Sequence, residues 1–385
     1  MWMKRAVTNC MYGVHLGDAL GVPFENMSRS EVLTATNGTG CTGPMFDLPV
    51  QRKVPDTRGL LPGATSDDSQ LANAVADALI QGDGYHHELM VLHHLYALWH
   101  DVAGWGSTTK RSLYEIDKWY RAANASIIKP PDFRGNAKNA ALWEKAEPRN
   151  PRLPARFASQ SRGNGVAMKI APLGAFLGAR HGTRAFNSGE AFARVWDLGR
   201  ITHEDPICTI AAYAVASVVG DLTCGISAEY AQLNMIKRVE DVEASLQLQH
   251  HGSDRFSHAL RKALSLSCQP EELWAFGSAG RSDALTSVAL ALVIWYRHCE
   301  DREPTAAVLE AINAGGDTDT VASMVGAMMG AGSAEPDWWP KAWVSSLKDG
   351  GSLARSLSSE LSGVARGNAL SPGWDRSELL RTIYT

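Results

Sequence analysis

The chain has 385 residues, of which 45% are hydrophobic and 20% are charged, so it can bury a large core without disulfides or a structural metal. This composition excludes a disordered or fibrous protein. The 37 lysines and arginines against 41 aspartates and glutamates give a net charge of -4, which argues against a protein that coats nucleic acid or an anionic membrane and favours small-molecule or protein substrates.

The segments expected to be helical share an apolar periodicity and a high content of Ala, Leu and Met. In chain order they are residues 6–20, 69–80, 88–100, 166–177, 205–219, 283–298, 305–314 and 320–331. Alternating runs of Val, Ile, Thr and Tyr, which are typical of strands, are nearly absent. The sequence therefore predicts an all-α fold in the form of a compact multi-helix bundle.

Neither a membrane span nor a secretory signal is expected. The most apolar stretch, residues 284–296, is too short for a bilayer core of about 30 Å and is predicted to be a buried core helix. The N-terminal residues 1–5 have the charges of a signal sequence, but Asn9, His15 and Asp18 interrupt the apolar region that should follow. The six cysteines form no Cys-x-x-Cys pair, so we expect a protein of the reducing cytoplasm.

Two expected helices carry glycines four residues apart: Gly13, Gly17 and Gly21 in the first, and Gly326 and Gly330 in the last. Residues at this spacing lie on one face of a helix. Since glycine has no side chain, each stripe predicts a close approach of two helix backbones in the core.

Two stretches are expected to be irregular insertions. Residues 26–64 are dense in glycine and proline, which a regular helix does not tolerate. Residues 129–162 contain five prolines and eight basic against three acidic residues; we interpret them as a solvated surface loop, with a flap for an anionic ligand or acidic protein as the alternative. Without an internal repeat or clear linker, residues 1–385 are expected to form one domain that ends in a tail, residues 333–385.

Four aspartates stand just before two of the expected helices, in Thr65-Ser66-Asp67-Asp68-Ser69 and in Gly315-Gly316-Asp317-Thr318-Asp319-Thr320. Carboxylate and hydroxyl oxygens of this kind suit Mg²⁺, Mn²⁺ or Ca²⁺ and not zinc. Two such turns brought together could hold two ions roughly 3.5 to 4 Å apart. The alternative is that each turn is an acidic helix cap, for which aspartate and serine are preferred residues.

Five segments in the same order resemble the motifs of the ADP-ribosylglycohydrolase family. They are residues 17–25, 66–70, 163–174, 202–206 and 315–320. The resemblance runs from about residue 6 to residue 332. This family includes the enzyme that reactivates dinitrogenase reductase and hydrolases that act on ADP-ribosylated arginine or serine.

The resemblance implies an all-α domain with an active cleft at helix N-termini and two divalent cations per chain, Mg²⁺ or Mn²⁺. The implied metal ligands are Ser66, Asp67, Asp68, Asp317, Asp319 and Thr320. The implied catalytic acids are Glu25, Asp67, Asp68 and Asp319. The implied substrate-binding residues are Gly163, Asn164 and Gly165, whose backbone amides would face a diphosphate, and His203. Two departures from the usual family pattern are serine in place of threonine at Ser66 and Ser69, and lysine in place of arginine at Lys169.

The implied activity is metal-dependent hydrolysis of the N- or O-glycosidic bond between ADP-ribose and an acceptor. Arginine on a protein is preferred, while serine, a nucleobase or a free ADP-ribosyl compound stay open. The alternative is an immunity or binding protein that neutralises an ADP-ribosyltransferase by docking on it. Because all six oxygen ligands are present, the hydrolase is favoured. The expected partners are an ADP-ribosylated substrate and, as a further candidate, such a transferase.

Two weaker candidates are residue clusters outside these motifs. One segment holds His86, His87, His93, His94 and His100, which we interpret as part of a solvated or partly buried helix and only secondarily as a metal site. Several tryptophans lie in the tail, among them Trp338, Trp339 and Trp343. Core packing is the expected role of these rings, and stacking on adenine is the alternative.

Overall fold

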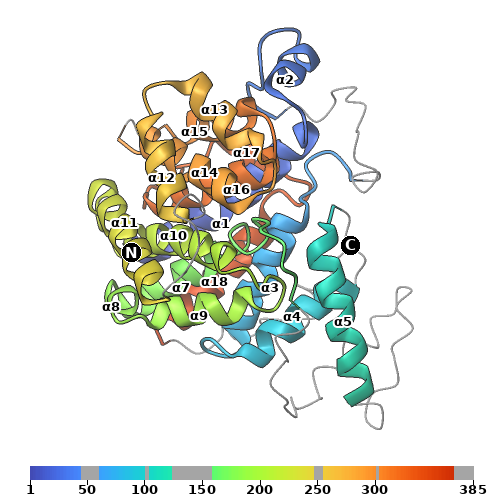
Figure 1. The fold of residues 1–385 in the computed structure, drawn as a ribbon, viewed down its shortest axis with the longest axis vertical. Coiled ribbons are helices and arrows are strands. Elements are labelled where there is room, and N and C mark those ends of the chain that lie inside the picture. Colours follow the sequence, from blue (N-terminus) through green and yellow to red (C-terminus); the bar gives the residue numbers. More distant parts are fainter. Residues whose placement is uncertain (45–59, 100–103, 124–157, 247–254, 301–302, 368–385) are drawn as a thin grey trace.

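The computed structural model describes residues 1–44, 60–99, 104–123, 158–246, 255–300 and 303–367, and its elements are helices throughout (Figure 1). They are α1 (Trp2–Gly21), the 3₁₀ turn η1 (Val22–Phe24), α2 (Arg29–Ala35), α3 (Asp67–Gln81), α4 (His87–Trp99), α5 (Ser107–Ala123), α7 (Ala171–His181), α8 (Arg184–Asn187), α9 (Glu190–Gly199), α10 (Pro206–Thr223), α11 (Ala228–Ser245), α12 (Phe256–Ser265), α13 (Pro270–Ala279), α14 (Ala284–His298), α15 (Pro304–Ala314), α16 (Thr318–Ala331), α17 (Lys341–Ser346) and α18 (Ser352–Ala365). The all-α prediction is confirmed.

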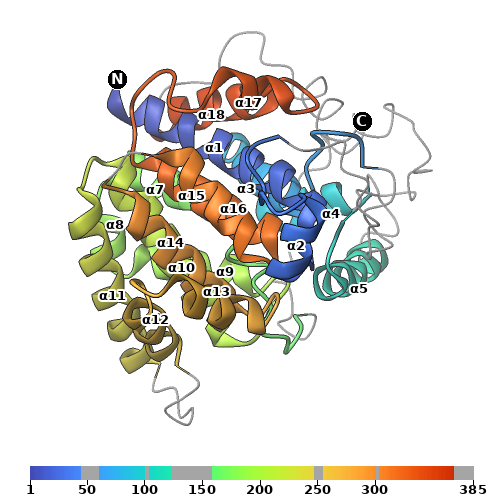
Figure 2. The same ribbon diagram turned by 90° about the horizontal axis from the view of Figure 1, so that it is seen from above.

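The N-terminal helix α1 lies along α16 at the centre of the molecule, with α18 on its other side (Figure 2). A Cβ atom built on Gly13 would meet the backbone oxygen of Gly326 at 2.0 Å, and one built on Gly17 would meet that of Ala322 at 2.1 Å. Any side chain at these positions would push the two backbones apart. The predicted close approach at the glycine stripes is therefore confirmed, and it joins the N-terminal helix to α16.

Another part of the core surrounds α10, which packs against α7, α11, α14 and α16. Among the described helices, α10 alone is long and apolar enough to cross a membrane by length and composition, but 94% of its apolar window is buried inside the fold. The predicted core helix at residues 284–296 lies within α14, whose side chains from Ala284 to Trp295 are mostly buried. Both apolar helices are core elements.

The prediction of one continuous helix over residues 166–177 was wrong at its start. Residues 165–169 form turns, and α7 begins at Ala171. The Asn164 carbonyl accepts the amides of Ala167 and Met168, which holds a tight turn before the helix. Pro172 then occupies the first helical turn, where a residue without an N–H group is tolerated.

The predicted irregular region 26–64 contains a helix, and so does the C-terminal tail. Within residues 26–64, α2 begins with a capping box in which the Ser28 side chain accepts the Glu31 amide and the Glu31 carboxylate accepts the Ser28 amide. The first glycine of residues 26–64 is Gly38, after the end of the helix, and no proline of this region precedes it. The glycine and proline content that predicted an irregular region is therefore confined to residues after the helix. The tail contains α17 and α18, and α18 packs against α1. Residues 45–59, 124–157 and 368–385 lie outside the described part of the chain.

Candidate active site

The two acidic turns predicted from the sequence lie together at the N-termini of α3 and α16. Asp67 and Asp68 begin α3, Asp317 is the N-cap residue of α16, and Asp319 lies in its first turn. The Thr320 hydroxyl donates to Asp68 Oδ2 at 3.3 Å. This hydrogen bond joins the turns directly, although 252 positions separate them in the chain.

Two groups of carboxylates could each hold a metal ion, because one oxygen from every member lies within 4.8 Å of the others. The first group is Asp18, Asp68 and Asp319, all buried, and the second is Glu25, Asp317 and Asp319, of which only Asp319 is buried. Asp319 belongs to both groups. The acids therefore form one continuous centre with a buried end and a more accessible end.

A short backbone pairing brings Glu25 beside Asp317. The Asn26 amide donates to the Gly316 oxygen at 2.8 Å, and the Gly316 amide donates to the Met27 oxygen at 2.7 Å. Gly315 and Gly316 have φ angles of 77° and 87°, which glycine adopts without strain. The Gly-Gly pair therefore allows the α15–α16 connection to lie against the segment that carries Glu25.

Asp18 on α1 is the residue of this centre that the predicted site did not include. Its carboxylate accepts the amides of Ser66 and Ser69, each at 2.9 Å, and the Ser66 hydroxyl at 2.8 Å. Three donors on one buried carboxylate fix the turn that carries Asp67 and Asp68. A buried aspartate next to Gly17 in the helix that carries the glycine stripe was the signal in the sequence, but its partners were too distant to infer.

We expect Asp18→Asn to loosen the acidic turn. The amide group places N–H donors against the donors of Ser66 and Ser69, which costs about 1–3 kcal/mol for a buried group left unsatisfied. Metal affinity should fall about tenfold, since loss of a supporting partner weakens metal sites 10- to 100-fold. Urea unfolding and calorimetric Mn²⁺ titration measure the two effects. An unchanged midpoint together with unchanged affinity would contradict the anchoring role.

Asp67 is not a member of either carboxylate group, and it contacts the loop that precedes α5. Its Oδ2 accepts the Gly106 amide at 3.1 Å. Beside it, the Trp105 indole donates to Gln70 at 2.7 Å. Ser66 and Thr320 instead both donate to Asp68 Oδ2, at 3.2 and 3.3 Å. Asp67 thus ties the α5 loop to the centre, and its predicted role as a metal ligand stays a prediction.

Burial and mutual repulsion raise the pKa values of these acids in the protein alone. Burial first, and then neighbouring carboxylates, raise the pKa of Glu25 to about 8. Burial raises the pKa of Asp67 to about 7, and burial together with neighbouring acids raises the pKa values of Asp68 and Asp319 well above the usual range. Within the described chain no lysine or arginine forms an ion pair with these carboxylates. The centre therefore has a strong deficit of positive charge.

The oxygen atoms that could serve as metal ligands in these groups also suit hard divalent cations. Asp68 Oδ1 is buried and has no hydrogen-bond partner among the described residues, so one of its lone pairs is left for a ligand. All donors in the two groups are carboxylate oxygens, which is the chemistry that Mg²⁺ and Mn²⁺ prefer. Cations in this centre would reverse the repulsion that raises the pKa values.

The predicted substrate-binding turn, residues 163–165, lies between this centre and His203. The Asn164 side chain donates to Asp317 Oδ2 at 2.7 Å and to the Ser287 hydroxyl at 3.1 Å. Its backbone amide donates to Ser282, so this amide is not free to face a diphosphate. A Cβ on Gly165 would meet the His203 ring at 2.9 Å. Glycine is therefore needed here because the imidazole packs against the turn.

The histidine-rich segment supports the helical interpretation. His93 lies between Asp77 Oδ2, 2.9 Å from its Nδ1, and Gln81 Oε1, 2.7 Å from its Nε2. His94 Nδ1 lies 2.6 Å from the Met90 oxygen. These imidazoles have separate partners, and the candidate metal groups found in the described chain contain carboxylates alone. His100 lies outside the described residues.

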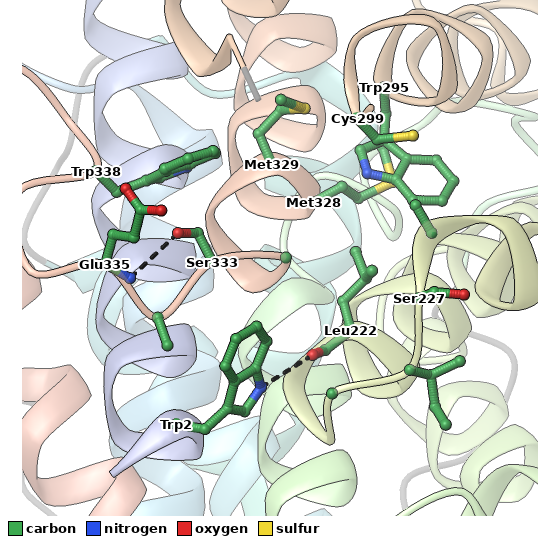
Figure 3. Close-up of a pocket in the computed structure, with 15 residues that line it drawn as sticks. Trp2, Leu222, Ser227, Trp295, Cys299, Met328, Met329, Ser333, Glu335 and Trp338 are labelled. Atoms are coloured by element: carbon green, nitrogen blue, oxygen red, sulfur yellow. Dashed lines mark hydrogen bonds between the residues drawn. The ribbon is translucent and has the colours of Figure 1, made fainter. Parts of the chain in front are cut away.

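A cavity of about 450 Å³ lies at the opposite end of α16 (Figure 3). Trp2, Met328, Met329 and Trp338 are among the residues that line it, and none of the clustered acids does. Asp319 is in the first turn of α16 and Met329 in its last, so a helix with a rise of about 1.5 Å per residue separates them. Trp338 is therefore remote from the acidic centre, while Trp339 and Trp343 are buried in the core, as expected.

Comparison with known proteins adds to this geometry. A profile of the ADP-ribosylglycohydrolase family matches residues 3–370. The chain belongs to this family. The match extends beyond the motif-bearing residues 6–332 and includes α17 and α18. Those two helices are thus part of the family fold.

Three other proteins resemble the chain over most of its length. An uncharacterized protein of Archaeoglobus fulgidus is 23% identical over 351 residues, 90% of this chain and 93% of that protein. The uncharacterized protein YegU of Escherichia coli K12 is 25% identical over 339 residues, 84% and 86% of the two chains. A solved structure described as an ADP-ribosylglycohydrolase-related protein complex has a TM-score of 0.56 at 19% identity and covers 94% and 99%. This last similarity supports the fold.

Proposed function

We propose that the protein is a metal-dependent hydrolase that cleaves the glycosidic bond between ADP-ribose and an acceptor, with arginine on a protein as the preferred acceptor. One observation supports this proposal most directly. The acids of two distant turns meet in two carboxylate groups that share Asp319. A blocking protein that only docks on a transferase has no need of such a centre, which costs folding energy through repulsion between buried charges.

The proposed ligands of two cations, Mg²⁺ or Mn²⁺, are the six sequence-predicted residues together with Glu25, while Asp18 is proposed as the carboxylate that supports the turn of Ser66 to Asp68. When bound, such cations lower the pKa of water and orient ribose hydroxyls. Asp319 is shared by both carboxylate groups, so it would contribute to holding either cation. The hydroxyls of Ser66 and Thr320 contact Asp68, so they are placed to hold that carboxylate or to bind metal themselves.

Glu25 is the proposed proton acceptor. It is partly exposed, in contrast to Asp68 and Asp319, so attacking water can reach it. Asn26 donates to Glu25 Oε1 at 3.0 Å and orients the carboxylate. Hydrolysis at the anomeric carbon develops positive charge on the ribose ring, and the surrounding carboxylates stabilise this charge.

A direct assay tests the proposal. Purified protein is incubated with ADP-ribose linked to arginine, to serine and to a nucleobase, with Mg²⁺ or Mn²⁺ and with EDTA. We expect release of ADP-ribose from the arginine-linked substrate in the presence of metal and its loss with EDTA. Release that persists in EDTA would contradict the metal centre. Tight binding to an ADP-ribosyltransferase without turnover on any substrate would favour the docking alternative.

A further inference from the structure

A lysine that forms no ion pair with any described residue is buried beside the candidate site. Lys169 is 0% exposed, and its Nζ lies 3.3 Å from the Thr202 hydroxyl, the partner that the described residues give it. The same hydroxyl lies 2.9 Å from Nδ1 of His203. Lys169, Thr202 and His203 thus form a chain of three polar groups that ends at the glycine turn, residues 163–165.

Counting hydrogen-bond donors and acceptors determines which atom carries each proton along these three side chains. A lysine ammonium can only donate, so the Thr202 oxygen accepts from it. The Thr202 hydroxyl proton must then go to His203 Nδ1, because a buried hydroxyl without an acceptor is costly. A neutral imidazole that accepts at Nδ1 carries its proton on Nε2. Burial, followed by the charge of Lys169, lowers the pKa of His203 to about 3, so the ring is neutral.

The remaining nitrogen points to the glycine turn. A Cβ built on Gly163 would lie 3.3 Å from His203 Nε2, and one built on Gly165 would lie 3.5 Å from it. No described residue accepts a hydrogen bond from Nε2. An N–H group at this position is therefore available to a ligand that lies on the turn.

We propose that Lys169 and Thr202 are positioning residues that hold His203 in its Nε2–H tautomer, so that the imidazole donates to a phosphate oxygen of the ADP-ribosyl group. The ligand part of this inference rests on the proposed function, whereas the tautomer does not. The opposite tautomer would present a lone pair to the anion and repel it. This relay of hydrogen bonds, from Lys169 through Thr202 to His203, also accounts for a charged side chain at position 169 within a buried segment.

The relay requires a charged lysine. Burial lowers the pKa of Lys169 to about 7, while Asp67 raises it. The titratable groups that face it are Asp67 at the start of α3, His94 on α4 and His203 itself. Measurements at pH 6.5 therefore keep the lysine largely protonated.

The test compares Thr202→Val with Thr202→Ser, which keeps the hydroxyl, in protein labelled with ¹⁵N-histidine. Two-bond ¹H–¹⁵N spectra at pH 6.5, assigned with His203→Gln, should show a single tautomer protonated at Nε2 in the wild type and in Thr202→Ser, and a mixture of both tautomers in Thr202→Val. With Mg²⁺ present, Thr202→Val should bind ADP-ribose about tenfold more weakly, as expected for one hydrogen bond to a charged group. If the unpaired lysine unfolds this variant, Lys169→Met/Thr202→Val removes the charge as well.

The possible outcomes distinguish the proposed His203 tautomer from the proposed function of the protein. A protonated Nδ1 in the wild type overturns the relay. The expected tautomer with equal ADP-ribose affinity in Thr202→Val and Thr202→Ser overturns the donor role of His203. Absence of any ADP-ribose binding by the wild type overturns the proposed function, while the spectra still decide whether Lys169 and Thr202 fix the tautomer.

Discussion

Asp319→Asn should abolish metal-dependent activity and, in the metal-free protein, raise the melting temperature. Asp319 belongs to both carboxylate groups, so its loss removes a ligand from each proposed cation. Since loss of outer partners alone weakens metal sites 10- to 100-fold, we expect a fall in kcat/KM of more than about 100-fold. Asparagine keeps the oxygen that accepts the Thr320 amide at 2.9 Å, so the helix start is preserved.

The stability change has the opposite sign for a physical reason. Burial and the carboxylates of Glu25, Asp68 and Asp317 raise the pKa of Asp319 well above its usual value. An acid whose pKa is higher in the folded than in the unfolded protein destabilises the fold once the pH exceeds the unfolded pKa. A neutral asparagine removes this destabilisation at neutral pH. In the wild type the same destabilisation should begin to decrease as the pH falls through the raised pKa and should be gone below the unfolded pKa.

Differential scanning fluorimetry with and without Mg²⁺ measures both effects. Saturating metal at 100 times Kd adds about 2.7 kcal/mol to the wild type, and this gain should be absent in Asp319→Asn. Asp349→Asn is the matched control, because Asp349 accepts the amides of Gly351 and Leu353 outside the acidic centre. A metal-dependent rise in Asp319→Asn equal to that of the wild type would refute the shared-ligand assignment.

The sequence predicted the long helices and the two acidic turns because these features depend on local patterns. The meeting of turns 252 positions apart is a tertiary contact, and the resemblance to a family was its support in the sequence. Apolar periodicity marked α1, α3, α10, α14 and α16, and doubled aspartates before two helices marked the centre. The resemblance to a family then gave the order of the motifs. In the structure, Asp68 and Asp319 belong to one carboxylate group, and Thr320 donates a hydrogen bond to Asp68.

The features that the sequence could not predict depend on partners far along the chain. Asp18 binds amides of Ser66 and Ser69, and no periodicity reports which backbone a carboxylate will meet. The helix α11, with several charged residues, lacks the dense apolar pattern used for the longer core helices. The glycines at 163 and 165 were predicted to bind a ligand, and the turn alone did not indicate that the His203 ring lies against both. In each case a tertiary contact determines the role of the residue.

Gly17→Ala should be among the most destabilising single substitutions in the chain. The added Cβ would lie 2.1 Å from the Ala322 oxygen and 2.5 Å from the Ser323 nitrogen, so only a displacement of α1 from α16 can accommodate it. Overpacking of a core typically costs 1–3 kcal/mol, and a clash with backbone should reach about 3 kcal/mol. Urea unfolding measures this cost as a lower midpoint with an unchanged slope.

The same substitution should weaken the acidic centre, because the seam between α1 and α16 sets its geometry. Asp18 follows Gly17 on α1, and Asp319 lies at the start of α16. Separating the helices moves Asp18 away from Asp319, so metal affinity should fall along with stability. The matched control is Gly363→Ala in α18, where an added Cβ meets no atom within 4 Å and the change should be neutral or stabilising by up to about 1 kcal/mol. Equal midpoints for the two variants would show that the backbone contact does not determine the packing of α1 on α16, and the proposed link between the glycine seam and the metal centre would then fail.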